Sequence, residues 1–207
     1  MDEVVRERAW LTLLIYPAVS GIVLGAASPP LPLGVLAYVG LIPFFLSLER
    51  LRGRAAFGAG FVQGVVFYGT TIYWISWITP PGTAGAIIYM SVFRGLFAWL
   101  LGHLRGRLGA LGLWAAAPLW VGFEYINSLG DMGFPWMLLG LTQTGVLPLI
   151  QYADVTGIYG VSFWVVLMNL TVLALVRAPR GARRGACAAA LGVLLIAPAL
   201  HGVWTMA

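Results

Sequence analysis

Long apolar runs separated by short polar connections occupy almost the whole chain. A transmembrane helix needs about 20 consecutive, mostly apolar residues, and seven segments reach or approach that length. They cover residues 9–27, 34–48, 55–77, 84–102, 108–126, 158–176 and 185–204. The pattern predicts an all-α fold, a polytopic membrane helix bundle of about seven transmembrane helices, in a single domain over residues 1–207. The second segment is short and is interrupted by Pro43.

The first apolar segment has an alternative interpretation as a signal peptide. Arg6 and Arg8 precede an apolar run that ends in the small residues of "GAAS", which is the general layout of a secretory signal. The run is long for such a signal, and we therefore interpret it as the first span.

One stretch departs from the pattern of clean spans. The sequence "GFPWMLLGLTQTGVLPLIQYADVTGIYG", residues 133–160, is almost as apolar as the spans but is broken by glycine, proline, glutamine and aspartate. Irregular backbone is tolerated at membrane depth only where it is buried in protein or lines a cavity. We predict that residues 127–157 form a re-entrant or interfacial segment that packs against the third and fifth spans. Trp136 should be among its deepest anchors.

Composition and charge support a membrane protein and set its expected orientation. The chain is 60% hydrophobic and 9% charged, whereas soluble domains carry about 25% charged residues. Eleven of its 12 basic residues, all arginines, lie before the first span or in alternate connections, around residues 50–54, 105–107 and 177–184. The positive-inside rule places those connections in the cytoplasm, the C-terminus outside, and residues 127–157 on the outer side. The net charge of +5 thus reports topology, and we expect no nucleic-acid partner.

Two charged residues fall inside predicted spans. Arg94 lies in the middle of the fourth span, and Glu124 lies near the outer end of the fifth. We expect Glu124 to lie about two helical turns closer to the outer membrane surface than Arg94. An arginine in a bilayer is costly and should face the bundle interior or a wet cavity. It could contact a lipid phosphate or carboxylate, or it could form a structural ion pair or extend toward an interface. The pairs Gly21/Gly25 and Gly60/Gly64 have the G-x-x-x-G spacing that permits close helix packing.

The block at 133–169 resembles the membrane region of apolipoprotein N-acyltransferases. The family pattern, G-F-P-W, L-G, Q, L-x-Q-x-A-D-x-x-G-x-x-G-V-S-F and N, falls on Gly133, Phe134, Pro135, Trp136, Leu139, Gly140, Gln143, Leu149, Gln151, Ala153, Asp154, Gly157, Gly160, Val161, Ser162, Phe163 and Asn169. The stretches "SPPLPLGVLAYVGLIPFFLSL" and "FYGTTIYWISW" are similar to the second and third spans of that family. The resemblance runs from about residue 20 onward.

The resemblance implies an activity that needs more than this chain. The family moves an acyl chain from a phospholipid to a cysteine of an outer nitrilase-like domain, and then to the N-terminal amine of a diacylglyceryl-modified lipoprotein. That domain carries a Glu-Lys-Cys triad, and these 207 residues contain no lysine. Cys187 lies at the cytoplasmic end of the seventh span and is expected to be a packing residue. We therefore expect no catalytic residues here, with chemistry supplied by a missing domain or a separate nitrilase-like polypeptide.

The same resemblance points to a bacterial cytoplasmic (inner) membrane and to phospholipid and lipoprotein as partners. The candidate substrate-binding residues are Trp74, Trp77, Arg94, Glu124, Phe134, Trp136, Gln143, Gln151 and Asp154. For each there is a structural alternative: interfacial anchoring for the aromatic residues, backbone hydrogen bonding for the glutamines, and helix capping for Asp154. Asn127 replaces an arginine that the family often has three residues after the glutamate, so any charge pair made there is in doubt.

No cofactor or metal ion is expected, because neither His103 nor His201 has partners at metal-ligand spacing. Two other functions stay open. The chain could be a non-catalytic membrane module that binds lipid or scaffolds a partner. A small transporter is less consistent with the sequence, because no matching halves with interrupted helices are visible.

Overall fold

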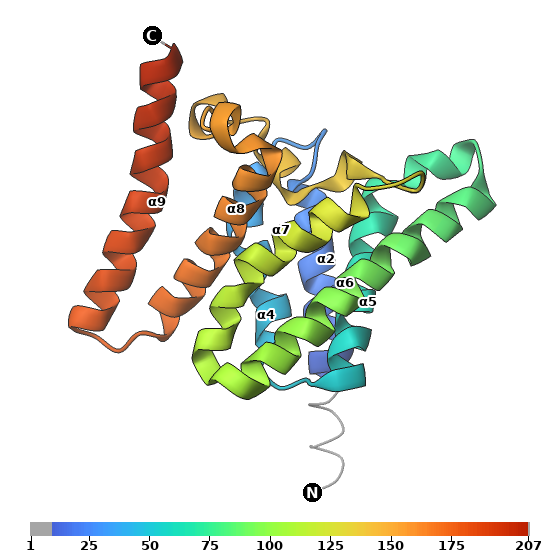
Figure 1. Cartoon of the computed structure of the whole chain (residues 1–207), viewed down its shortest axis with the longest axis horizontal. Coiled ribbons are helices and arrows are strands. Elements are labelled where there is room, and N and C mark those ends of the chain that lie inside the picture. Colours follow the sequence, from blue (N-terminus) through green and yellow to red (C-terminus); the bar gives the residue numbers. More distant parts are fainter. Residues whose placement is uncertain (1–9, 207) are drawn as a thin grey trace, which may run out of the picture.

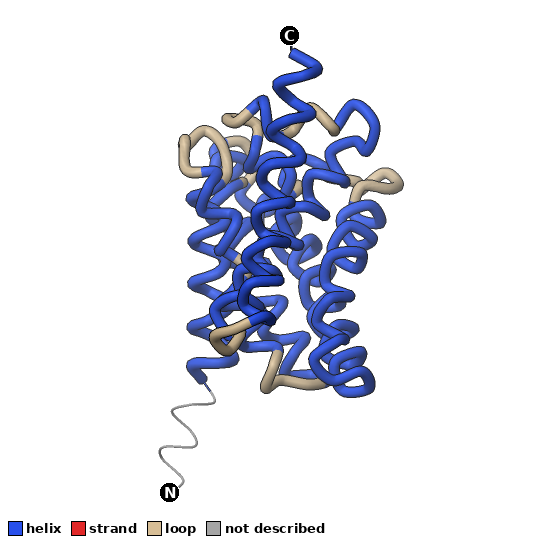
Figure 2. Tube along the Cα trace, turned by 90° about the vertical axis from the view of Figure 1, so that its left-hand side faces the viewer, coloured by secondary structure: helices blue, strands red, loops and turns tan. Residues whose placement is uncertain are grey.

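The structure is a computed structural model that describes residues 10–206 (Figure 1). Arg6 and Arg8, which contributed to the predicted orientation, lie outside the described residues. Within the described part of the chain every regular element is a helix and there is no strand, which confirms the all-α fold. Loops gather at the two ends of the helix bundle (Figure 2).

The N-terminal part of the described chain, as far as residue 48, forms a short helix pair with a break in its second arm. The π-helical turn η1 (Leu11–Ile15) leads into α2 (Tyr16–Ala27), and η2 (Gly34–Leu36) leads into α3 (Ala37–Gly40) and α4 (Ile42–Leu48). The break between α3 and α4 is held by Asn169, whose amide donates to the Ala37 carbonyl at 2.7 Å and accepts from the Leu41 N–H at 2.8 Å. In a continuous helix these two backbone groups would bond to each other. The side chain has taken the place of that backbone bond.

The middle of the chain forms three long arms. Helix α5 (Gly53–Thr71) ends six residues before the predicted third span does, and η3 (Tyr73–Trp77) follows it. Helix α6 (Pro80–Leu108) then runs back, and η4 (Gly109–Ala115) and α7 (Ala116–Asn127) follow. Gly109 has φ +59°, a conformation that favours glycine, and there the chain reverses into a hairpin (Figure 1).

The two G-x-x-x-G pairs are helix-packing sites, as their spacing predicts. A Cβ on Gly21 would lie 2.9 Å from the Gln63 carbonyl oxygen of α5, and one on Gly25 would collide with Thr70. Gly64 faces Ser91 of α6, and Gly60 faces the backbone carbonyl of Arg94. The glycines therefore bring α5 against α2 on one side and against α6 on the other, which places Arg94.

The stretch after α7 is a chain of short turns, followed by two long helices. It contains the 3-10 turns η5 (Pro135–Met137), η6 (Leu139–Gln143) and η7 (Leu147–Leu149), before α8 (Ala153–Arg177) and α9 (Ala182–Met206). Helix α8 is kinked at Gly157, which has φ +64°. Helix α9 stands at the side of the bundle (Figure 1), where it packs on α8 and η7.

Three helical runs among the described residues are long and apolar enough to cross a membrane. They are Pro80–Asn127, α8 and α9, and Thr12–Ala27 and Gly34–Leu48 are shorter apolar helices. Residues 50–54, 105–107 and 177–184 lie at one end of the bundle, which we call the basic end (Figure 1). Residues 127–152 lie at the opposite end. The long aromatic core residues Phe44, Phe67, Phe97 and Trp120 lie between the two ends and are almost fully buried.

Candidate functional site

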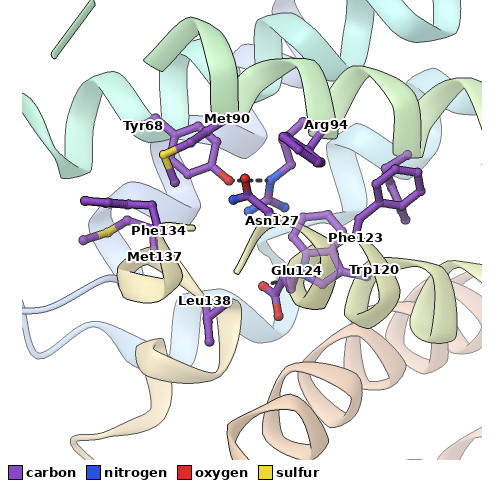
Figure 3. A pocket seen from close by; sticks show the side chains of 12 residues that line it. Tyr68, Met90, Arg94, Trp120, Phe123, Glu124, Asn127, Phe134, Met137 and Leu138 are labelled. Carbon is purple, nitrogen blue, oxygen red and sulfur yellow. Dashed lines mark hydrogen bonds between the residues drawn. The ribbon is translucent and has the colours of Figure 1, made fainter. Parts of the chain in front are cut away.

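The residues between α7 and α8, 128–152, are called the broken segment below. A cavity opens between α5, α6, α7 and the start of this segment (Figure 3). It is narrow, with about 20 Å³ of free volume for water-sized molecules, and it is partly open to the surroundings. The lining is aromatic and apolar except for one tyrosine hydroxyl, one arginine, one glutamate and one asparagine. These residues are Tyr68, Met90, Phe93, Arg94, Phe97, Trp120, Phe123, Glu124, Asn127, Phe134, Met137 and Leu138.

Arg94 is the cation of this cavity, and aromatic rings surround it. Its guanidinium carbon lies 3.8 Å from the Trp120 ring centroid, 5.2 Å from Phe67 and 5.6 Å from Tyr68. Its Nε–H donates to the Tyr68 hydroxyl at 3.3 Å. The side chain is buried, yet no ion pair joins it to any described carboxylate. Ring faces therefore surround the charge, and such contacts stabilise a desolvated cation by about 2 kcal/mol or more.

Glu124 is the anion of the cavity and fastens the broken segment to α7. Its Oε1 accepts from the Trp120 indole N–H at 2.9 Å and from the Leu139 backbone N–H at 2.7 Å. Its other oxygen, Oε2, is buried and makes no hydrogen bond of ordinary geometry. Arg94 and Glu124 line one cavity (Figure 3), and they form no ion pair.

Asn127 stands where the family often has an arginine. It lies on the same face of α7 as Trp120 and Glu124, because residues 120, 124 and 127 are about one helical turn apart. Its backbone carbonyl accepts from the Phe134 N–H at 3.2 Å, and its side-chain Oδ1 is buried without a hydrogen-bond partner. With a neutral amide at this point, Arg94 is the only cation among the described residues that line the cavity.

The lining suits binding better than covalent chemistry. It contains one arginine and one glutamate among apolar and aromatic walls, and the arginine fits an amphiphile with an anionic group. The described residues that line it include no cysteine, lysine or histidine. Cys187 lies in α9 toward the basic end, far along the chain from these residues, and no group of three metal-binding side chains occurs among the described residues.

Three of the nine predicted site residues, Arg94, Glu124 and Phe134, line this cavity. Trp136 was expected to be deeply buried, and this is wrong: 54% of it is exposed. The 3-10 turn at Pro135–Met137 directs Phe134 and Met137 to the cavity and leaves Trp136 on the outside. There its ring stacks on Trp74, with centroids 6.0 Å apart. Trp77 is more exposed still and contacts only Tyr73 among the described aromatic rings.

Gln143 and Gln151 form hydrogen bonds within or beside the broken segment, and Asp154 lies at the start of α8. Gln143 is fully buried, and its amide donates to the Gly34 carbonyl at 2.9 Å and to the Thr142 hydroxyl at 2.8 Å. Gln151 donates to the Leu147 carbonyl at 3.1 Å. Asp154 is exposed in the first turn of α8, with its Oδ1 3.9 Å from His201 Nε2 of α9. None of these three reaches the cavity.

The expected packing of the broken segment against the third and fifth spans is one part of a larger contact. Glu124 and Trp74 supply contacts from α7 and η3, as above. The segment also packs on α8, where the Ser162 hydroxyl accepts from the Gly140 N–H at 2.8 Å, and on α9 through η7. The segment is therefore a packed cap at the end of the bundle opposite the basic end.

Sequence reasoning missed several lining residues, most importantly Tyr68 and Trp120. For Trp120 a signal was present, because it lies four residues before Glu124 and must share its helix face. Tyr68 carried no such signal, since its approach to Arg94 depends on how α5 packs on α6.

The fold and the cavity define a class: an all-helical protein with membrane-length apolar helices and a buried arginine in an aromatic cavity at one end. Comparison with known sequences then shows the family. The sequence model of the family described as "Apolipoprotein N-acyltransferase N-terminal domain" matches residues 20–171. This chain therefore belongs to the apolipoprotein N-acyltransferase family.

Individual relatives agree with this assignment. The chain is 35% identical to an apolipoprotein N-acyltransferase of Geobacter metallireducens over 79% of its own length and 33% of the relative. It is 32% identical to that of Chlorobaculum tepidum, covering 77% and 31%. It is 36% identical to apolipoprotein N-acyltransferase 1 of Treponema pallidum, covering 80% and 31%. The chain thus spans about a third of the length of these relatives, and it resembles bacterial membrane proteins.

Proposed function

We propose that this chain is the membrane region of an apolipoprotein N-acyltransferase, and that the Arg94 cavity binds the phospholipid acyl donor. The observation that carries the proposal is the aromatic-walled cation of a cavity built inside the matched region. The lipid phosphate would lie against the guanidinium, which forms no salt bridge with any described carboxylate. The acyl chains would lie on the phenylalanine and methionine walls.

The orientation follows from the arginines. With about seven crossings of a bacterial inner membrane, the basic end lies in the cytoplasm and the cavity opens near the outer leaflet. A diacylglyceryl-modified lipoprotein would approach from the same side. A reporter fused after residue 207 should be active only outside the cytoplasm, and activity only inside would reverse this orientation.

The chemistry is assigned to a nitrilase-like domain outside these residues, in the same or a separate polypeptide. A base of that domain would take the proton of the cysteine thiol, and the thiolate would attack the ester carbonyl. The acyl C–O bond would then break, and the base would return the proton to the departing oxygen, which releases a lysophospholipid with a free hydroxyl group. The N-terminal amine of the lipoprotein would then attack the thioester, forming the amide and returning the thiol. The residues described here would position the two lipids, because a lysine-free chain cannot supply the family's triad.

A chimera tests the proposal directly. Residues 1–207 replace the matching third of the Geobacter metallireducens relative, and acylation of a diacylglyceryl peptide is followed by mass spectrometry. We expect activity in the chimera and none in residues 1–207 alone. Arg94→Gln should raise the KM for phospholipid, whereas Arg54→Gln, an exposed arginine outside the cavity, should leave it unchanged. An unchanged KM in the Arg94 variant would overturn the assigned site.

A further inference from the structure

A second cavity lies at the basic end, away from Arg94. It is lined by η4, the last turns of α8 and the first turns of α9, has a free volume of about 300 Å³, and is partly open to the surroundings. We call it the basic-end cavity. Its lining residues are Ala110, Leu113, Trp114, Leu170, Leu173, Ala174, Arg177, Ala178, Arg183 and Cys187. The helices that form it converge at the same end in Figure 1.

The charge around this cavity is positive. Arg183 is exposed and makes no ion pair with any described residue. Arg177 binds the Glu49 carboxylate through both Nη atoms, with Nη2 to Oε2 at 2.8 Å. Arg105 also lies 3.8 Å from that carboxylate, and its Nε and Nη1 have no hydrogen-bond partner. One carboxylate thus faces two arginines, and Arg183 adds a third positive charge.

The rest of the cavity is apolar. Leu170 and Leu173 form a buried wall on α8, and Trp114 presents a partly exposed ring from η4. Arginine at the mouth and leucine with tryptophan behind it are the two halves of a site for an anionic amphiphile. A small inorganic anion would use the arginine and leave these walls uncovered.

We propose that the basic-end cavity binds an anionic phospholipid from the adjoining leaflet. Its phosphate lies against Arg183 and the outer edge of Arg177, and one acyl chain lies against Trp114, Leu170 and Leu173. Basic pockets between membrane helices are suited to anionic headgroups because the phosphate gains a localised positive partner. A zwitterionic lipid carries its own ammonium group and gains less. The site is separate from the acyl-donor cavity, so it stands whether or not the proposed acyl transfer does.

Tryptophan fluorescence gives a direct measurement. The full chain is reconstituted in phosphatidylcholine nanodiscs that contain a minor fraction of phosphatidylglycerol with brominated acyl chains, which quench nearby indoles. The contribution of Trp114 is the difference between the wild type and Trp114→Phe. We expect stronger quenching of Trp114 by brominated phosphatidylglycerol than by the same fraction of brominated phosphatidylcholine.

Two variants separate the site from general membrane contact. Arg183→Gln should lower the apparent affinity for brominated phosphatidylglycerol about five-fold, the effect of one arginine near a membrane surface. Arg107→Gln makes the same charge change at the same end but outside the cavity, and should have little effect. Ala110→Phe fills the cavity without changing charge and should also reduce Trp114 quenching.

Three outcomes would overturn the proposal. They are equal quenching by the two brominated lipids, equal effects of the Arg183 and Arg107 variants, and loss of the phosphatidylglycerol signal when inorganic phosphate is added. The last would show an anion site with no need for a lipid. Circular dichroism of each variant shows whether its helices are intact. Ala110→Phe tests the site independently of any arginine.

Discussion

The Arg94 guanidinium carbon lies 3.8 Å from the centroid of the Trp120 ring, and the same indole donates its N–H to Glu124 at 2.9 Å. One side chain thus contacts both charges of the cavity, the cation through its ring face and the anion through its edge. The two groups thus share a cavity without forming a salt bridge. In the proposed function, an incoming lipid phosphate would pair with the guanidinium.

Substitution of Trp120 should separate these two contacts. Trp120→Phe keeps an aromatic face beside Arg94 but removes the hydrogen bond to Glu124. Trp120→Leu removes both, and should destabilise the fold by about 3 kcal/mol, near the cost of truncating a buried tryptophan. We expect Trp120→Phe to retain phospholipid binding and Trp120→Leu to lose it, measured by lipid retained through purification. Equal binding in the two variants would show that the ring face does not matter.

Glu124 should control how firmly the broken segment is attached. Glu124→Ala leaves the buried Leu139 N–H without its acceptor, at a cost of about 1–3 kcal/mol. We expect residues 127–157 to become more accessible to added protease, while the helices stay intact by circular dichroism. Glu124→Gln keeps a carbonyl acceptor and should protect the segment better. The idea fails if Glu124→Ala is cut no faster than the wild type.

Gly60 should be required for the position of Arg94. Gly60→Ala would place a methyl group against the Arg94 carbonyl oxygen and 2.6 Å from the Ala98 Cβ, so α6 must move away from α5. The matched control is Gly69→Ala in the same helix, where no atom lies within 4 Å of the added methyl. We expect a lower thermal midpoint and weaker phospholipid binding for Gly60→Ala only. Similar midpoints for the two variants would contradict the packing described here.

Asn169 should stabilise the break in the second predicted span. Asn169→Leu would leave the Leu41 N–H and the Ala37 carbonyl unpaired in the interior, each costing about 1–3 kcal/mol. Gln151→Leu is a suitable control, because that amide donates to the carbonyl of Leu147, only four residues away. Unfolding followed by circular dichroism in mild detergent should show a large loss for the first variant and a small one for the second.

Much of the architecture could be predicted from local features of the chain. The apolar runs specified helices, the arginines marked one end of the bundle, and Gly21/Gly25 and Gly60/Gly64 marked close helix contacts. The broken segment was recognised because its glycines and prolines interrupt an apolar run. These features depend on neighbours in sequence or on helical periodicity, and so they can be predicted without knowledge of the tertiary structure.

The site was less predictable. Arg94, Glu124 and Phe134 were identified from residue type and motif, but Trp136 was assigned the buried position that Phe134 and Met137 share. A single 3-10 turn decides which of these side chains faces inward, and no periodic pattern reports it. Likewise Gln143 and Asn169 reveal their roles only through partners more than 100 residues away.

By itself, then, the sequence determined that this is a helical membrane protein of the apolipoprotein N-acyltransferase family, with one arginine inside it that needs an explanation. Only the tertiary structure decided what surrounds that arginine. Tyr68, Trp120 and Glu124 come from two other helices, and their approach depends on how α5, α6 and α7 stagger against one another. Helix formation is governed by contacts a few residues apart, whereas the cavity is made by contacts between segments that the chain separates.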